Sequence, residues 1–197
     1  MKKPSLVELI AFIGLTFGVA GALSASASAT APAAQDKPVF DLGVDYNYVR
    51  SNAAPGECGC FSLNGGDGWV GYNLTKSLGA VAEISGQHAG NPDNSGDSLN
   101  LISYLFGPRY RWHRISHFEP FGEVLFGGSR ATGRVATGGS GSLNAFAMTA
   151  GGGLDVNLTR RLGLRAFQAD YFFTHFRNGV NDHQNNLRIS GGLVLRF

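Results

Sequence analysis

Apolar and polar residues alternate along most of the chain after residue 38. In the last stretch, Leu187, Ile189, Leu193, Leu195 and Phe197 share one register, and the other register is mostly small or charged. Because successive side chains of a β-strand point to opposite faces, this alternation predicts a strand with one apolar face. Seven earlier stretches share it, and the eight predicted strands cover residues 39–50, 68–74, 78–87, 99–112, 118–127, 145–158, 163–174 and 187–197.

The connections between these strands alternate in length. Those after the second, fourth and sixth strands are short, whereas those after the first, third, fifth and seventh are long and polar, at 51–64, 88–98, 128–144 and 175–185. Tight turns at one end and long loops at the other are typical of an outer-membrane barrel with its long loops outside the cell. Since no stretch after residue 38 has a clear helical period, we predict an all-β fold, an eight-stranded antiparallel up-and-down transmembrane β-barrel at residues 38–197.

The N-terminal segment has the pattern of a secretory signal. Lys2 and Lys3 precede an apolar run at 9–23, and small residues follow it with A-x-A cleavage sites at 25–27 and 27–29. We predict a cleaved signal peptide at residues 1–29 and a flexible lead at 30–37. An uncleaved membrane anchor is the alternative, although the run is shorter than the ~20 residues that a spanning helix needs. The mature chain is therefore expected in the bacterial outer membrane, after passage through the periplasm.

Composition narrows the functional classes. Charged residues make up 15% of the chain, below the roughly 25% of soluble domains. The formal net charge of +2 is too small to suggest nucleic acid as a partner. No residue pattern indicates a cofactor or a metal site.

The polar face of the strands decides whether the apolar face meets a protein core or lipid. Charged residues lie in the middle of several predicted strands, on the polar face. In a membrane barrel this face lines a polar lumen. Aromatic residues fall where interfacial girdles belong, with Tyr46 and Tyr48 near the outer end and Trp112 and Phe197 near the inner rim. We therefore expect lipid against the apolar face.

Three charged residues, Glu83, Arg109 and Glu123, lie on the polar face of successive strands, each a few residues from its turn. At ~3.3 Å per residue they can meet at a similar depth. We predict an ion network centred on Arg109 that plugs the lumen, joined by Arg111, Asp155 and Arg188. Buried charges must be paired or they cost several kcal/mol. The alternative reading of these residues is a gated ion or proton path.

The chain resembles the small eight-stranded OmpA/OmpX-type outer-membrane barrels. The likeness rests on the signal peptide, GVDYNY at 43–48, YLFGPRY at 104–110, GGGLDV at 151–156 and LVLRF at 193–197. It implies that Phe197, Leu195 and Leu193 belong to the signal read by the barrel-assembly machinery, with outer-membrane lipid and lipopolysaccharide as surroundings and a monomeric state. Many OmpA proteins continue into a peptidoglycan-binding domain, which is not expected here.

Cys58 and Cys60 are the two cysteines, and both lie in the first predicted outer loop. In an oxidising compartment we predict a small disulfide within the loop, which Gly59 would permit in a strained form. Free or intermolecular thiols are the alternatives, and a bare C-x-C is a weak metal signal because it lacks a second ligand pair.

Two functional hypotheses follow. The first is a non-catalytic structural or surface-interaction protein that presents four extracellular loops without an open general pore; Arg130, Arg134, Arg177 and His175 could meet lipopolysaccharide phosphates there or be ordinary solvated charges. The second is a lipid-modifying enzyme of the lipid A deacylase kind, built on His175, Asp182, His183 and Ser190. Such a site needs its base within hydrogen-bond reach of the nucleophile.

Overall fold

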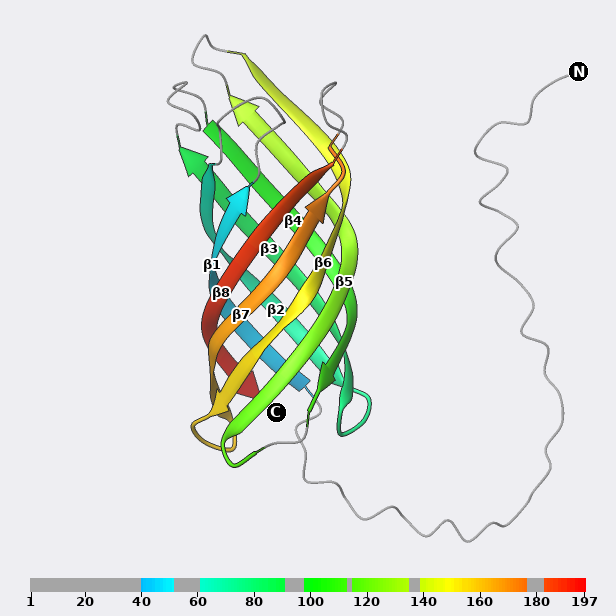
Figure 1. Ribbon diagram of the computed structural model, residues 1–197, viewed down its shortest axis with the longest axis vertical. Coiled ribbons are helices and arrows are strands. Elements are labelled where there is room, and N and C mark those ends of the chain that lie inside the picture. The colour runs from blue at the N-terminus through cyan, green and yellow to red at the C-terminus, as the bar shows by residue number, and fades with distance from the viewer. Residues whose placement is uncertain (1–39, 52–60, 91–97, 113–114, 135–138, 177–182) are drawn as a thin grey trace, which may run out of the picture. The chain divides into compact units, whose positions relative to one another are not determined.

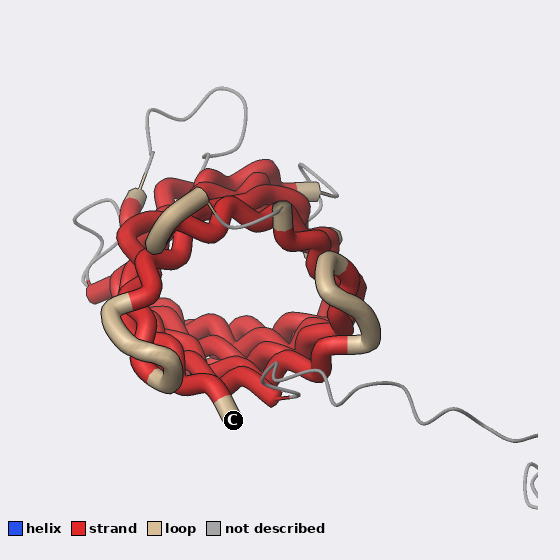
Figure 2. The backbone as a smooth tube through the Cα atoms, turned by 90° about the horizontal axis from the view of Figure 1, so that it is seen from below, coloured by secondary structure: helices blue, strands red, loops and turns tan. Residues whose placement is uncertain are grey.

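The chain forms a closed antiparallel β-barrel. The computed structural model describes residues 40–51, 61–90, 98–112, 115–134, 139–176 and 183–197. Each strand pairs with its sequence neighbours and β1 pairs with β8, as Figure 1 and Figure 2 show, which confirms the predicted eight-stranded up-and-down barrel. The strands are β1 (Phe40–Ser51), β2 (Ser62–Asn73), β3 (Leu78–Gly90), β4 (Ser98–Arg111), β5 (Phe118–Arg134), β6 (Ser140–Asn157), β7 (Leu162–Thr174) and β8 (Gln184–Arg196). The predicted signal peptide 1–29 and lead 30–37 lie outside the described residues.

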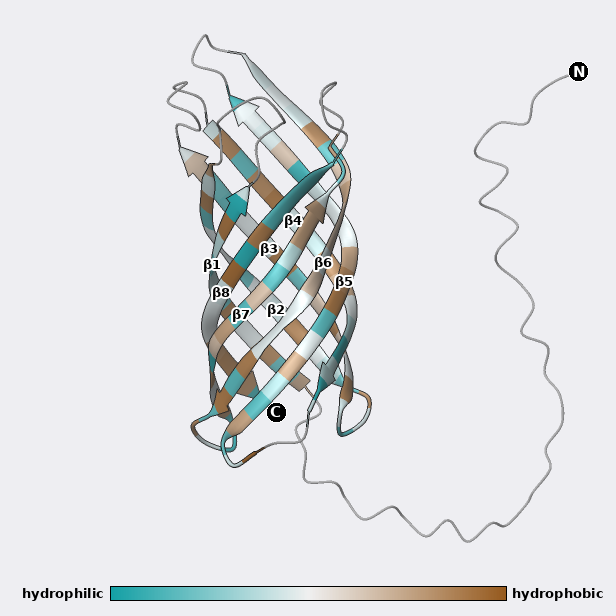
Figure 3. Ribbon diagram, viewed as in Figure 1, coloured by the Kyte–Doolittle hydropathy of each residue, from teal (hydrophilic) through white to brown (hydrophobic). Residues whose placement is uncertain are grey.

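Alternation along each strand places apolar side chains on the outer surface. Phe106 is 68% exposed and Leu195 44%, whereas the neighbours of Leu195, Val194 and Arg196, are 0% and 4% exposed. Figure 3 shows the resulting alternation of hydrophobic and hydrophilic positions along the strands. An outward apolar face on a closed barrel, which leaves no strand edge unpaired, is the arrangement that lipid requires. None of the described residues belongs to a helix long and apolar enough to span a membrane.

The two ends of the barrel differ. The end that we call the turn end carries Phe40, Phe197 and the short connections at 74–77, 112–117 and 158–161. Two of these turns use the same device, in which a threonine hydroxyl accepts hydrogen bonds from two later backbone N–H groups: Thr75 at 3.3 and 2.9 Å, and Thr159 at 3.2 and 2.9 Å. The opposite end, which we call the loop end, carries the connections β1–β2, β3–β4, β5–β6 and β7–β8.

Three strands extend five or more residues beyond one predicted end. β2 begins at Ser62 rather than at 68, β5 extends to Arg134, and β6 begins at Ser140. Their extra residues are rich in Gly, Asn and Ser, which favour turns locally. In the barrel the extra residues of β5 pair with both neighbours, those of β2 pair with both from Asn64 on, and those of β6 pair with β5. These ladder hydrogen bonds outweigh local preference. The predicted third loop at 128–144 is therefore mostly strand, and Arg130 and Arg134 belong to β5.

Candidate functional site

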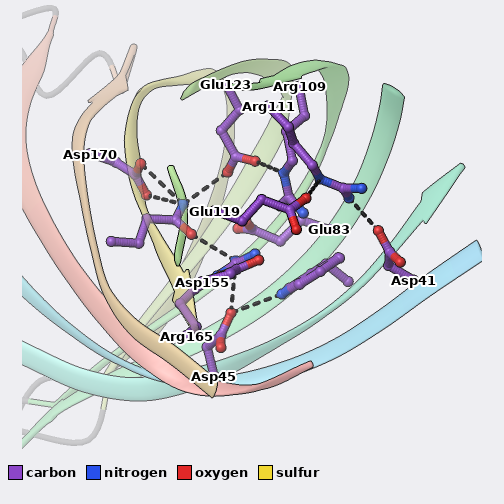
Figure 4. Close-up of polar contacts among 12 residues, drawn as sticks. Asp41, Asp45, Glu83, Arg109, Arg111, Glu119, Glu123, Asp155, Arg165 and Asp170 are labelled. Atoms are coloured by element: carbon purple, nitrogen blue, oxygen red, sulfur yellow. Dashed lines mark hydrogen bonds and ion pairs between the residues drawn. The ribbon is translucent and has the colours of Figure 1, made fainter. Parts of the chain in front are cut away.

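The interior of the barrel is filled by a charged network toward the turn end. Its members come from β1 and from β3 to β8, and most are buried (Figure 4). The carboxylates are Asp41, Asp45, Glu83, Glu119, Glu123, Asp155 and Asp170, and the guanidinium groups belong to Arg109, Arg111, Arg165, Arg188 and Arg196. Every strand but β2 thus contributes charge to one connected cluster.

Arg188 on β8 joins two carboxylates. Its guanidinium donates to both oxygens of Glu83, the Nη2–Oε2 distance being 3.1 Å. It also contacts Asp170 Oδ2, at 2.8 Å from Nη2 and 2.9 Å from Nε. Because β3 and β7 are not neighbours in the barrel, this arginine ties opposite parts of the wall together.

Arg165 on β7 is a second junction. Its Nε donates to Asp155 at 3.0 Å, and its Nη1 donates to Asp45 at 3.1 Å and to Gln168 at 2.7 Å. Gln168 links Arg165 to two further carboxylates, because its amide donates to Glu123 Oε1 and to Asp170 Oδ2, both at 2.8 Å. The Arg165 and Arg188 clusters are therefore one network.

Two aromatic rings lie against two guanidinium groups of this network. Arg109 and Arg165 lie 4.1 and 4.4 Å from the Trp69 ring and 4.9 and 4.4 Å from the Phe121 ring, within cation–π range. The Trp69 indole donates to Asp45 at 2.8 Å. Gly43 makes room for the indole, because a Cβ there would overlap the ring.

A third group closes the turn end of the lumen. Arg111 pairs with Asp41 and lies 3.7 Å from Glu119. Arg196 lies 3.6 Å from Glu119 and 3.5 Å from Asp155, which links this group to Arg165. The charged network thus continues to the mouth of the barrel at this end.

The six residues of the predicted network all contribute to it, but with different partners. Arg109 pairs with Glu123 at 2.6 Å. Glu83, expected beside Arg109, instead pairs with Arg188, and among the described carboxylates Arg109 makes a salt bridge with Glu123 alone. The junctions are Arg165 and Arg188, not Arg109. The other two predicted members, Arg111 and Asp155, take part through Asp41 and Arg165.

Arg165 was missed because β7 contains a β-bulge. The register shifts between Arg165 and Gln168, so both side chains face inward although their positions have opposite parity. Strict alternation placed Arg165 on the outer face with Phe167. A short stretch holding both an arginine and a polar residue at odd spacing is a weak sequence signal of such a bulge.

Toward the loop end the described inner side chains are uncharged, and many of them are apolar. Buried Val49, Leu63, Ala89, Leu101 and Phe172 belong to one hydrophobic cluster, against which Phe61, Leu99, Ala131 and Phe176 pack. The expected polar lumen is therefore charged toward the turn end and mixed polar and apolar toward the loop end. Alternation predicts which face of the barrel a side chain lies on. It does not predict that apolar side chains on the inner face will fill the interior.

Among the described residues of the hydrolase hypothesis, Ser190 and His183 do not meet. Ser190 is buried in the barrel wall, and its hydroxyl has no hydrogen-bond partner among the described residues. His183 stacks on Phe173 at 6.2 Å near the loop end. His183 precedes Ser190 by seven residues in the same strand region, about 23 Å at ~3.3 Å per residue. Asp182 lies outside the described residues, as do Arg177 and the disulfide candidates Cys58 and Cys60.

The C-terminal strand closes the barrel. Leu193, Leu195 and Phe197 are 49%, 44% and 61% exposed on the outer surface. The Phe197 N–H donates to the Phe40 carbonyl at 2.9 Å, and the Phe40 N–H donates back at 3.3 Å. Among the described residues, no three His, Cys, Asp or Glu side chains are grouped so as to hold a metal ion.

Comparisons place this architecture among known proteins. The model of the outer membrane protein beta-barrel domain matches residues 17–197. Three solved barrels share the fold: Neisserial surface protein A (14% identity, TM-score 0.64, covering 83% of this chain and 100% of that one), Ail of Yersinia pestis (16%, 0.53, 80% and 98%) and OprG of Pseudomonas aeruginosa (12%, 0.53, 82% and 97%). No curated protein matches the sequence.

Proposed function

Because this chain belongs to the outer membrane protein β-barrel family, we propose that it is a non-catalytic surface protein of the bacterial outer membrane. A filled barrel holds extracellular loops at its loop end and contacts the lipopolysaccharide around it. The proposal includes a cleaved signal peptide and insertion by the barrel-assembly machinery through the C-terminal strand.

The distribution of charge carries the proposal. Every carboxylate in the described residues points into the barrel, whereas the outward-facing charged side chains of the strands are basic. A surface of this kind attracts anions. In the outer leaflet the abundant anionic groups are phosphates, and guanidinium groups bind phosphate in a bidentate manner.

The basic rim, which we define as Arg50, Arg130 and Arg134, lies at the loop end. All three side chains are exposed, and Arg130 and Arg50 donate to Ser142 at 3.3 Å and Ser62 at 3.0 Å. Arg130 follows the lipid-facing ring of Phe126 by four residues, about 13 Å at ~3.3 Å per residue. The rim therefore stands above the apolar band, at the level of headgroups.

A relative offers a parallel for an anionic ligand. Ail of Yersinia pestis, the attachment invasion locus protein, was solved in complex with the heparin analogue sucrose octasulfate. Its identity to this chain is 16%, so the likeness extends to the fold, and the rim of this chain is argued from its own arginines.

The test is binding of lipopolysaccharide to the refolded protein in detergent. We expect Arg130→Gln/Arg134→Gln to weaken binding about tenfold or more and to reduce its dependence on salt, since exposed charge attraction is screened by ions. The matched control is Arg160→Gln/Arg161→Gln, which removes two exposed arginines from the turn end. Equal affinity of both double variants and wild type would refute the proposed rim.

The enzymatic alternative has a separate test. Lipid A from cells with and without the protein should have the same mass, because Ser190 is buried away from His183. Acyl chains missing from lipid A only when the protein is present would establish a hydrolase instead.

A further inference from the structure

Two glycines on the outer surface of β2 and β3 have no packing reason to be glycine. On the inner face a side chain would often strike the wall, since a Cβ would lie 1.9 Å from a backbone oxygen at Gly65 and 2.1 Å from one at Gly107. On the outer face, a Cβ at Gly86 meets no described atom within 4 Å, and at Gly68 the nearest is the Gly43 carbonyl oxygen at 3.9 Å. Glycine weakens a strand relative to alanine, so another reason is needed here.

The register brings these glycines together with a third. Gly66 and Gly68 are successive outward positions of β2, and Gly66 pairs with Gly86. Directly paired residues on one face of a sheet have Cβ positions about 5 Å apart. A Cβ at Gly66 would contact the Asp45 carbonyl oxygen alone, at 3.1 Å. The three glycines therefore form one patch of bare backbone, which we call the glycine groove.

Large apolar side chains border the glycine groove on both sides. Val44 and Tyr46 on β1 are 63% and 61% exposed, and Ile84 on β3 is 62% exposed. Because neighbouring strands lie about 4.8 Å apart, these two walls are about 10 Å apart, which is wide enough for one hydrocarbon chain. Tyr46 does not cover the floor, since its hydroxyl donates to Asn64 at 2.8 Å and none of its atoms lies within 4 Å of a Cβ at Gly66.

Polar groups follow the glycine groove directly toward the loop end. Asn64 and His88 occupy the next outward positions of β2 and β3, pair with each other and are exposed. His88 Nδ1 is hydrogen-bonded to Asn100 Oδ1 at 2.8 Å. Arg130 of the basic rim lies two strands from Gly86 in the same register row, about 10 Å away. Along the outer surface an open apolar groove is thus succeeded by amide and imidazole groups, with a guanidinium group beside them.

We propose that the glycine groove binds one acyl chain of lipopolysaccharide. Asn64 and His88 then contact the amide and hydroxyl groups where the chain joins its sugar, and the rim arginine faces a phosphate. The order of chain, sugar and phosphate in this lipid matches the order of groups on the surface, and glycine within a strand often marks the close approach of a ligand. The site rests on the proposed function, which assigns the loop end to the outer leaflet.

The test measures binding of lipopolysaccharide to refolded protein in detergent after the groove is filled. We expect Gly68→Leu to weaken binding at least about fivefold, the value of some ten lost van der Waals contacts. The loss should be the same at low and high salt, because no charge is removed. Gly86→Leu is a second filling variant with the same expectation. The matched control is Ala82→Leu, which adds bulk at another outward position of β3, nearer the turn end, and should bind like wild type.

Deacylated lipopolysaccharide separates the groove from the basic rim, because it keeps the sugar and phosphates but lacks the chains. It should bind both filling variants as it binds wild type, whereas Arg130→Gln/Arg134→Gln should weaken its binding. Wild-type affinity of both filling variants for intact lipopolysaccharide would overturn the site, as would an equal loss of affinity for phosphatidylglycerol. A wild-type dimer that Gly68→Leu converts to a monomer would assign the groove to a second copy instead. Failure of both filling variants to show the gel mobility of a folded barrel would also overturn it, because an open groove should accept a side chain.

Discussion

Gly43 is a single residue on which the centre of the ion network depends. Its missing side chain lets the Trp69 indole lie over β1, in contact with two guanidinium groups and bonded to Asp45. A methyl group here would force the ring out of that position. The network thus depends on the missing side chain at Gly43 as well as on the charged side chains of the other strands.

We expect Gly43→Ala to destabilise the barrel by about 1–3 kcal/mol, the usual cost of overfilling a packed interior. Tryptophan emission should shift to the red as Trp69 is displaced. The control is Gly86→Ala on β3, because a Cβ at Gly86 has no atom within 4 Å. Urea unfolding in detergent measures both, and equal midpoints for the two variants would contradict the steric argument.

At the scale of the element, β7 shows what the bulge does. Ala166 is the extra residue, since Arg165 pairs with Asp155 and Phe167 pairs with the adjacent Leu154. Residues on either side of it keep their faces: Arg165 points inward, Phe167 outward and Gln168 inward. The bulge therefore adds a residue to the strand while the network stays in register.

Two single-residue deletions test this reading. Deleting Ala166 restores regular alternation with Arg165 and Gln168 still inside, so we expect a folded barrel that migrates differently on gels before and after boiling. Deleting Ala169, three residues away, shifts one part of β7 by a position and reverses its faces. That variant should fail to fold, and equal mobility patterns for the two deletions would be incompatible with the bulge.

How far the sequence predicted the fold also follows from the elements. Alternation gave all eight strands because the outer surface is apolar along nearly every one of them. It missed the ends of β2, β5 and β6, where polar and glycine-rich residues are strand only because they pair with a neighbouring strand. Within the network it brought Arg109 and Glu123 together, as the structure does, but it did not pair Arg188 with Glu83, which meet across 105 residues.

For the whole molecule, the interior is filled in two ways. Ion pairs and aromatic rings occupy the half toward the turn end, and uncharged side chains, among them Val49, Leu101 and Phe172, fill the half toward the loop end. An eight-stranded barrel has an interior just wide enough for its own side chains. Ions would have to cross both a charged layer and an uncharged one.

We therefore expect no conductance in planar bilayers, and none after Arg109→Ala, because Arg165, Trp69 and Phe121 still occupy that level. The control is a protein batch whose gel mobility shows complete folding. Discrete, reproducible channel openings in wild type, or openings that appear with Arg109→Ala, would favour a gated channel.

The hydrogen bonds between Phe40 and Phe197 have a consequence for how the protein is made. The first strand finds one of its two neighbours only after the last strand has left the ribosome. Until then the earlier strands, each with an apolar face, leave unpaired edges that are prone to aggregate with other chains. This topology favours export of an unfolded chain that chaperones protect. The barrel then closes in a single late step.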